Sequence, residues 1–319
     1  MSILRRSTWI AWIENFVVAF IITATFYILS PIHSDVSSLK SISIPKGATS
    51  QSIIAQLNTR GYNISVIDSF ILGQMGKIKQ GKVASKKQAL NRIDFLYTMT
   101  KAKIALLRIT LIPGETNEIF LGLVAKKVDI NKTKLLNAYK TYAKYPEAGI
   151  SADTYLVPKK MNEEKLIKFL LESSERKYKK LAEKAYGEYN TSQWHKILTI
   201  ASIIQKEAAN NQEMPLIASV IFNRLKKNMR LQMDGTLNYG KYSHIKVTPH
   251  RIKTDKSSFN TYKHKGLPSS PIGSVSVHAI QSAIHPATSK YLYFMRNKDG
   301  VHDFTDTFKK HRRNIRKVQ

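Results

Sequence analysis

One apolar segment near the N-terminus constrains the fold more than any other feature of the sequence. Residues 10–29 read IAWIENFVVAFIITATFYIL, close to the roughly 20 residues that a helix needs to cross a bilayer. Glu14 and Asn15 interrupt the run near its N-terminal end, where side chains can reach the headgroups. We therefore predict a transmembrane anchor over residues 10–30.

The flanks of this segment predict its orientation. Arg5 and Arg6 precede it, and the positive-inside rule then places residues 1–9 in the cytoplasm and the rest of the chain outside. A cleaved signal peptide is the alternative, but its apolar region would be shorter and followed by small residues at the cleavage site. The segment instead ends in LSPIHS, which favours an uncleaved, single-pass anchor.

The charge balance of the chain predicts a polyanionic partner. Lys and Arg number 51 against 22 Asp and Glu, a formal net charge of +29. Such a surplus suits nucleic acid, an anionic membrane face or an acidic polymer, but an extracytoplasmic location disfavours nucleic acid. The sequence has no cysteine, which excludes disulfides and thiolate chemistry. The histidines show no metal-binding spacing, so neither a metal nor a cofactor is predicted.

Two folded parts are predicted after the anchor, giving an α+β protein. Residues 31–40 form a polar linker, and residues 41–112 form a small β/α unit that ends in a strand over 104–112. With about 70 residues this unit is too small for a deep active site, which favours a binding or spacing module. Residues 113–319 form a larger, mostly helical domain in which residues 229–276 supply long, site-forming loops.

Glu207 is the most informative residue of the predicted helix over 192–210. At 100° per residue, Ile197, Ile200, Ile204 and Glu207 share one stripe, whereas Gln205 lies about 200° round the helix from Glu207. Three interpretations of Glu207 remain open at this point. It ends the stripe in water, it forms a structural salt bridge, or it is a desolvated general acid with a raised pKa.

The following loops carry the side chains of a sugar-binding groove. Residues 228–240 and 259–262 bring together amide, carboxyl, hydroxyl and aromatic groups, ahead of the turn-forming 266–268. Amides can bridge hydroxyl and acetamido groups, and aromatic rings stack on the apolar faces of sugars. Taken singly, each tyrosine could instead pack in the core, and each Asn or Gly could serve a turn. Together with Glu207, the loops favour a glycan cleft.

Ordered sequence blocks then carry a family resemblance. They read ASIIQKE (201–207), VIFNRL (220–225), MRLQMDGT (229–236), NTY with GLP (260–262 and 266–268), HPA (285–287), YLYF (291–294) and HDF (302–304). With these blocks the chain resembles the endolytic murein transglycosylases of the MltG or YceG-like family. The resemblance implies one transmembrane helix, a LysM-like domain over 41–112 and a catalytic domain over 113–319.

The resemblance also implies which residues form the site. The family's catalytic acid corresponds to Glu207, the second acidic position of its E-K-E motif, and Gln205 replaces the first. Gly235 stands where the family usually has proline. Asp234 could instead cap a helix or turn. The implied substrate-positioning residues are Gln232, Asp234, Thr236, Asn260, Thr261 and Tyr262.

The activity implied by the resemblance is cleavage of the β-1,4 bond from N-acetylmuramic acid to N-acetylglucosamine inside peptidoglycan strands, which leaves 1,6-anhydro ends. It would terminate or trim nascent strands at the bacterial inner membrane, with peptidoglycan synthases as further partners. Two alternatives from other classes remain. One is a non-catalytic peptidoglycan-binding scaffold, and the other is a membrane-tethered nucleic-acid binder, which leaves the ordered blocks unexplained.

Overall fold

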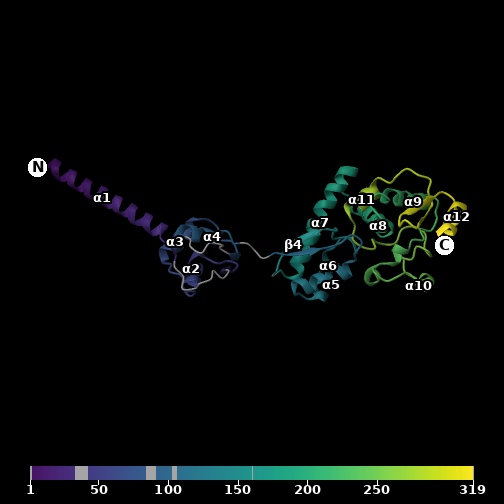
Figure 1. The fold of residues 1–319 in the computed structure, drawn as a ribbon, viewed down its shortest axis with the longest axis horizontal. Helices are drawn as coiled ribbons and strands as arrows, with labels where there is room; N and C mark the ends of the chain where they lie inside the picture. Colours follow the sequence, from purple (N-terminus) through teal and green to yellow (C-terminus); the bar gives the residue numbers. More distant parts are fainter. Residues whose placement is uncertain (1, 33–41, 84–90, 103–105, 160, 319) are drawn as a thin grey trace. The chain divides into compact units, whose positions relative to one another are not determined.

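The protein is a helix-rich α+β chain of two compact units. A computed structural model describes residues 2–32, 42–83, 91–102, 106–159 and 161–318. The first unit comprises Met1–Leu106 and the second Leu107–Gln319. Helices dominate both units, and each also holds short paired strands (Figure 1). The predicted fold class is therefore confirmed at this level, and residues 33–40 of the predicted linker lie outside the described residues.

The first unit begins with a long helix, α1 (Ser2–Leu29). Its stretch Thr8–Leu29 is long and apolar enough to cross a membrane, and none of that stretch is buried against other parts of the protein. The predicted apolar helix is therefore present. Its insertion into a membrane and its orientation stay predictions.

The remainder of the first unit packs three short helices against a two-stranded sheet. Strand β1 (Ile42–Ile44) pairs antiparallel with β2 (Gly81–Val83). The helices are α2 (Ser50–Asn58), α3 (Val66–Gln74) and α4 (Arg92–Thr100). Their buried faces form one core, whose most enclosed members are Ile53, Leu57, Leu72, Leu96 and Met99.

One predicted strand belongs to a different unit from the one we expected. Strand β3 (Leu106–Thr110) pairs with β4 (Thr154–Pro158) of the second unit, and Ile109 and Leu111 are buried in the core of that unit. The predicted strand over 104–112 therefore does not close the first unit. Its partner is distant in sequence, so local patterning could not reveal the pairing.

The second unit contains two hydrophobic cores. The first gathers around β3, β4, α5 (Asn117–Val128), α6 (Lys132–Tyr142) and α7 (Glu163–Tyr186). The second gathers around α8 (Thr191–Glu207), α9 (Met214–Lys226) and α11 (Val277–Ile284), which contact one another (Figure 1). Helix α8 is the central element of this second core, because most of its residues from Trp194 to Ile204 are buried.

The chain between α9 and α11 consists mainly of loops, as the composition predicts. It contains only three short helices within its described residues: η1 (Asp234–Leu237), η2 (Gly240–Tyr242) and α10 (Pro249–Thr254). After α11, β5 (Tyr293–Arg296) pairs antiparallel with β6 (His302–Thr305), and α12 (Phe308–Val318) follows. Strand β5 is mostly half-buried and belongs to a two-stranded ribbon.

Candidate active site

Glu207 is the last residue of α8 and ends the predicted apolar stripe. Ile197, Ile200 and Ile204 are buried in the second core, whereas the side chain of Glu207 is only partly buried. The helix stops here because Ala208 has an extended backbone. The carboxylate of Glu207 therefore lies where the buried core ends and the loop region begins.

The surroundings of Glu207 move its titration close to neutral pH. The pKa of Glu207 is raised from 4.5 to about 7, mainly by burial, and the negative charge of Asp234 acts in the same direction. Two groups act in the opposite direction: the Gly235 N–H, which donates to Glu207 Oε1 at 2.8 Å, and the positive charge of Arg224. Among the described residues, no Lys, Arg or His forms a salt bridge with Glu207, which disfavours the structural salt-bridge interpretation.

Gln205 faces a different part of the protein. Its Oε1 accepts a hydrogen bond of 3.2 Å from the backbone N–H of Ser276, the residue that caps α11. Glu207 contacts the loop at Gly235 instead. The helical geometry predicted this separation, and the side chain of Gln205 serves the packing of α8 on α11.

Asp234 and Tyr262 form a polar pair near Glu207. The hydroxyl of Tyr262 donates to Asp234 Oδ1 at 2.6 Å. Burial raises the pKa of Tyr262, and its hydrogen bond to Asp234 and the charges of Asp234 and Glu207 raise it further. The side chain of Asp234 is exposed and that of Tyr262 half-buried. Both are therefore accessible from solvent beside the carboxylate of Glu207.

Gln232 also presents its side chain to solvent. Its backbone is left-handed, with φ of 47°, and its N–H donates to the carbonyl of Thr261 at 3.1 Å. That bond connects the loop before η1 to the loop that carries Tyr262. The exposed amide of Gln232 thus lies two residues before Asp234 on the same loop.

Thr236 and Thr261, two of the predicted substrate-positioning residues, lie inside the protein. Both are buried, and their hydroxyl oxygens lie 2.9 Å apart. The Thr236 hydroxyl donates to the carbonyl of Met233, and the Thr261 hydroxyl accepts from the N–H of Met233 at 3.2 Å. Their hydroxyls are thus enclosed and bonded within the protein, and contact of these two residues with substrate stays a prediction.

Asn260 is the third predicted substrate-positioning residue that lies inside the protein. It is fully buried, and its side-chain amide donates to the carbonyls of Ile252 and Asp255, both at 2.8 Å. Its Oδ1 accepts from the N–H of Tyr262 at 3.1 Å. Asn260 therefore fixes the backbone that presents Tyr262 and has no amide group left for a substrate.

Gly235 is a site residue that the sequence marked only as a departure from the family pattern. A Cβ at this position would lie 2.7 Å from Glu207 Oε1 and 2.8 Å from the Cβ of Lys206, closer than packed atoms approach. A proline at this position would lack the N–H that bonds Glu207. This chain therefore has a backbone donor to Glu207 that depends on glycine.

Arg224 is a second residue that the sequence analysis did not assign to the site, although it lies in the VIFNRL block. Its guanidinium is buried and donates to the carbonyls of Leu292, at 2.6 Å, and of Leu231. It also lies 5.3 Å from the ring centre of Tyr293. Arg224 therefore joins α9 to the strand region while its charge acts on Glu207.

A second cluster of ionisable groups lies next to Lys206. Its Nζ donates to the hydroxyl of Ser243 at 2.8 Å, and Nε2 of His244 lies 2.8 Å from Oε2 of Glu115. Burial raises the pKa of Glu147 to about 8, while the charge of Lys206 opposes the rise. Within the described ranges, no three His, Asp or Glu side chains are grouped to hold a metal ion.

The aromatic rings of the loops partly cover one another's faces. Tyr239 and Phe259 stack with ring centres 4.2 Å apart, and Tyr242 meets Tyr239 edge-on. Each of the two stacked rings therefore has one face covered by its neighbour. A sugar could stack only on an outer face.

The fold and the site together define an α+β protein of two units, with one titratable carboxylate at the end of a buried helix. The profile of the YceG-like family matches residues 42–317. The chain belongs to the YceG-like family.

Curated relatives and a solved structure agree with this assignment. The chain is 40% identical over 117 residues to an endolytic murein transglycosylase of Bacillus subtilis, a match covering 37% of this chain and 32% of the relative. It is 34% identical over 127 residues to an endolytic murein transglycosylase of Streptococcus pneumoniae, covering 38% and 23%. The matched region thus spans a third or less of each relative.

The structural match is more extensive. The crystal structure of a yceG-like protein from Listeria monocytogenes superposes with a TM-score of 0.58 at 26% sequence identity. It covers 86% of this chain and 98% of the Listeria chain. The likeness therefore extends well beyond the region matched in the curated relatives.

Proposed function

We propose that this chain is a membrane-anchored lytic transglycosylase that cleaves peptidoglycan strands internally, at the bond from N-acetylmuramic acid to N-acetylglucosamine. The observation that carries the proposal is Glu207, a partly buried carboxyl whose pKa of about 7 suits proton transfer in both directions. The names of the B. subtilis and S. pneumoniae relatives support the same substrate class.

The first step is protonation of the glycosidic oxygen by Glu207. The bond from C1 of the muramic acid to that oxygen then breaks. The N-acetylglucosamine leaves with a free 4-hydroxyl, and an oxocarbenium-like centre forms on the muramic acid. Glu207 has become a carboxylate, and the N–H of Gly235, 2.8 Å from Oε1, stabilises that charge.

The second step closes a ring. The Glu207 carboxylate removes the proton from the 6-hydroxyl of the same muramic acid, and O6 bonds to C1 to give the 1,6-anhydro product. Glu207 is protonated again and no water is consumed. A hydrolytic glycosidase needs a second carboxylate to activate water or attack the sugar. An internal nucleophile removes that need, so Glu207 can act alone as acid and then as base.

Three accessible side chains position the strand. The Asp234–Tyr262 pair offers a carboxylate and a hydroxyl beside Glu207, and Gln232 offers an amide. The negative charge of Asp234 also favours the protonated form of Glu207. The loops that carry these side chains are held in place by buried hydrogen bonds of Thr236, Asn260 and Thr261.

The location follows from the N-terminal helix. With α1 as a single-pass anchor and the N-terminus inside, the second unit works outside the bacterial inner membrane, where nascent strands are made. Trimming or terminating those strands would bring the chain next to peptidoglycan synthases. The first unit serves as a LysM-like module, and no nucleic-acid partner is proposed.

The products of the purified full-length protein test this function. Sacculi are digested in water enriched in ¹⁸O and the fragments are analysed by mass spectrometry. The proposal predicts 1,6-anhydro-muramic ends without ¹⁸O. Reducing ends that carry ¹⁸O would indicate a hydrolase instead. Binding to sacculi with no new ends would indicate the non-catalytic scaffold.

A further inference from the structure

One face of α3 exposes apolar side chains to solvent. Val66 is 84% exposed, Ile67 57% and Phe70 70%. At 100° per residue these three positions fall within a sector of about 100°. The one charged residue of α3, Asp68, lies on the opposite face and is fully buried. This face, called here the α3 apolar face, is therefore both unpartnered and uncharged.

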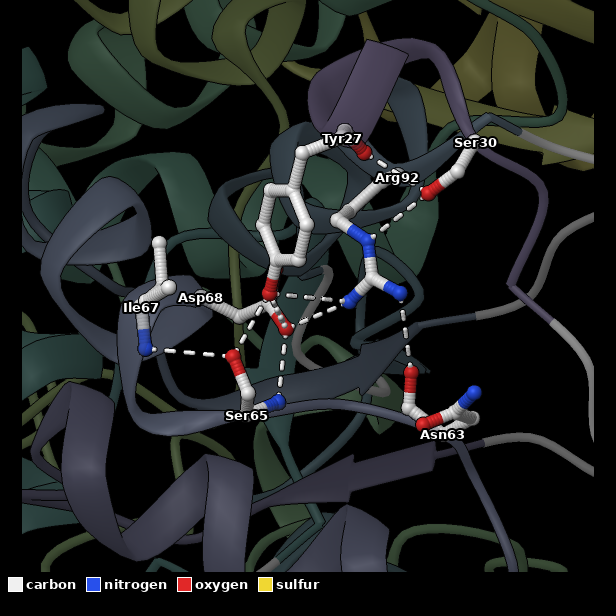
Figure 2. A network of polar contacts seen from close by, with 7 residues as sticks. All are labelled: Tyr27, Ser30, Asn63, Ser65, Ile67, Asp68 and Arg92. Atoms are coloured by element: carbon white, nitrogen blue, oxygen red, sulfur yellow. Dashed lines mark hydrogen bonds and ion pairs between the residues drawn. The ribbon is translucent and has the colours of Figure 1, made fainter. Parts of the chain in front are cut away.

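A hydrogen-bond network places the α3 apolar face beside the end of α1. The hydroxyls of Tyr27 and Ser65 lie 2.5 Å apart, and the Tyr27 hydroxyl donates to Asp68 Oδ2 at 3.1 Å (Figure 2). Ser65 is the N-cap of α3, so Val66 and Ile67 come directly after a residue in contact with Tyr27. The first turn of α3 is thus level with the last turn of α1.

Arg92 fixes this arrangement from α4. Its guanidinium pairs with Asp68 at 2.5 Å, and both side chains are buried. It also donates to the hydroxyl of Ser30 and to the carbonyl of Asn63, each at 3.2 Å (Figure 2). Its backbone N–H donates to the Ser30 carbonyl at 2.9 Å. A buried pair with further hydrogen bonds holds α1, α3 and α4 in one geometry.

The length of α1 determines the depth at which this hydrogen-bond network would lie relative to a bilayer. Trp9 and Tyr27 are about 27 Å apart along the axis at 1.5 Å per residue, close to the hydrocarbon thickness of about 30 Å. Aromatic residues at such spacing favour the two membrane interfaces. If α1 spans the membrane, Tyr27 lies at the outer interface. Val66 and Ile67 then lie at the same interface.

We propose that the α3 apolar face inserts into the outer interfacial layer of the membrane, so that the first unit sits on the bilayer. This inference depends on the membrane anchor of the proposed function. Continuity with α1 identifies the lipid as the occupant, because the apolar side chains begin where the membrane span ends. An interfacial helix buries its apolar face in the same way.

Site-directed spin labelling of the full chain in lipid vesicles tests the proposal. The sequence has no cysteine, so Phe70→Cys gives a single nitroxide site, and Ile67→Cys gives a second. Both positions are exposed, so a label should not disturb the core. Ile22→Cys in α1 is the bilayer reference, and Glu188→Cys, exposed in the second unit, is the water reference.

Collisions with oxygen, which concentrates in lipid, are compared with collisions with a water-soluble nickel complex. We expect the oxygen-to-nickel ratio at positions 67 and 70 to be several-fold higher than at 188. A ratio equal to that at 188 would overturn the proposal. Low access to both reagents would also overturn it, because a protein partner or a second copy would then cover the face.

The reference site separates this inference from the proposed anchor. If position 22 reports lipid and position 70 reports water, the anchor stands and only the seating of α3 is wrong. If position 22 itself reports water, the membrane location of the proposed function fails and this inference fails with it.

Discussion

At the scale of single residues, the site depends on opposing effects on one carboxyl. Burial and Asp234 raise the pKa of Glu207, while the Gly235 N–H and Arg224 lower it, and the result is a pKa of about 7. A much higher pKa would leave a poor proton donor, and the ordinary value would leave a weak base. In the proposed mechanism, this balance lets one side chain serve as acid and then as base.

Gly235 should not tolerate a side chain. In Gly235→Ala the new Cβ would lie 2.7 Å from Glu207 Oε1, so the carboxyl must move. We expect turnover of sacculi to fall by about 10- to 100-fold, because displacement of a catalytic group by about 1 Å has such effects. Gly122→Ala is the matched control, since its Cβ would meet only Lys132 at ordinary distances. Equal activity of the two variants would show that the Gly235 contact is unimportant.

The pKa of Glu207 also predicts a pH dependence of stability. A carboxyl with a folded pKa of about 7 and an ordinary value of 4.5 favours folding when protonated. Its contribution is complete below pH 4.5 and is lost as the pH rises through about 7. Glu207→Gln lacks this loss, so its unfolding free energy relative to the native sequence should rise by about 3 kcal/mol between pH 4 and pH 8. Thermal unfolding across that range measures it, and a constant difference would contradict the assigned pKa.

At the scale of elements, the helices were more predictable than the strands. The 3.6-residue period located α8 and its stripe, and hence Glu207, because helix patterning is local. Strands β2 and β4 could not be located from local patterning, since each has only a few residues and depends on a distant partner. The same limit placed β3 in the wrong unit.

The sequence predicted where the site residues lie along the chain, but not which of them are buried. Motif order located Glu207, Asp234 and Tyr262, which the structure brings together. It could not separate them from Thr236, Asn260 and Thr261, because burial is set by tertiary packing. A short polar residue inside a motif looks the same in sequence whether it contacts a ligand or supports a loop.

The supporting role of Thr261 gives a prediction at this scale. Thr261→Val keeps the shape but leaves the N–H of Met233 and the hydroxyl of Thr236 without their partner. We expect a loss of about 1–3 kcal/mol in unfolding free energy, with little change in affinity for glycan strands. Thr141→Val, at an exposed helix position, should leave both unchanged. A loss of affinity without loss of stability would restore Thr261 as a substrate contact.

At the scale of the whole molecule, the proposed function gives the two units separate tasks. The residues around Glu207 all belong to the second unit, while the network around Arg92 ties α1 to the rest of the first unit. The surplus of positive charge, which alone could indicate a nucleic-acid binder, then suits anionic lipid and the carboxylates of peptidoglycan peptides.

Breaking the buried ion pair should therefore affect one unit and spare the other. Asp68→Asn leaves Arg92 buried without its counter-charge, which costs about 3–5 kcal/mol, so the first unit should unfold at a lower temperature. Cleavage of soluble glycan fragments should continue at the native rate. Asp94→Asn, at an exposed position of α4, is the control. Loss of cleavage at temperatures where only the first unit has unfolded would show that the two units depend on each other.

The central claim is that Glu207 is the acid and base of strand cleavage. Its most direct test is the yield of 1,6-anhydro-muramic ends from sacculi treated with Glu207→Gln, beside Glu188→Gln as an exposed glutamate control. The account predicts no detectable anhydro ends from Glu207→Gln, native yield from Glu188→Gln, and binding to sacculi by both. Anhydro ends at the native rate from folded Glu207→Gln would contradict it.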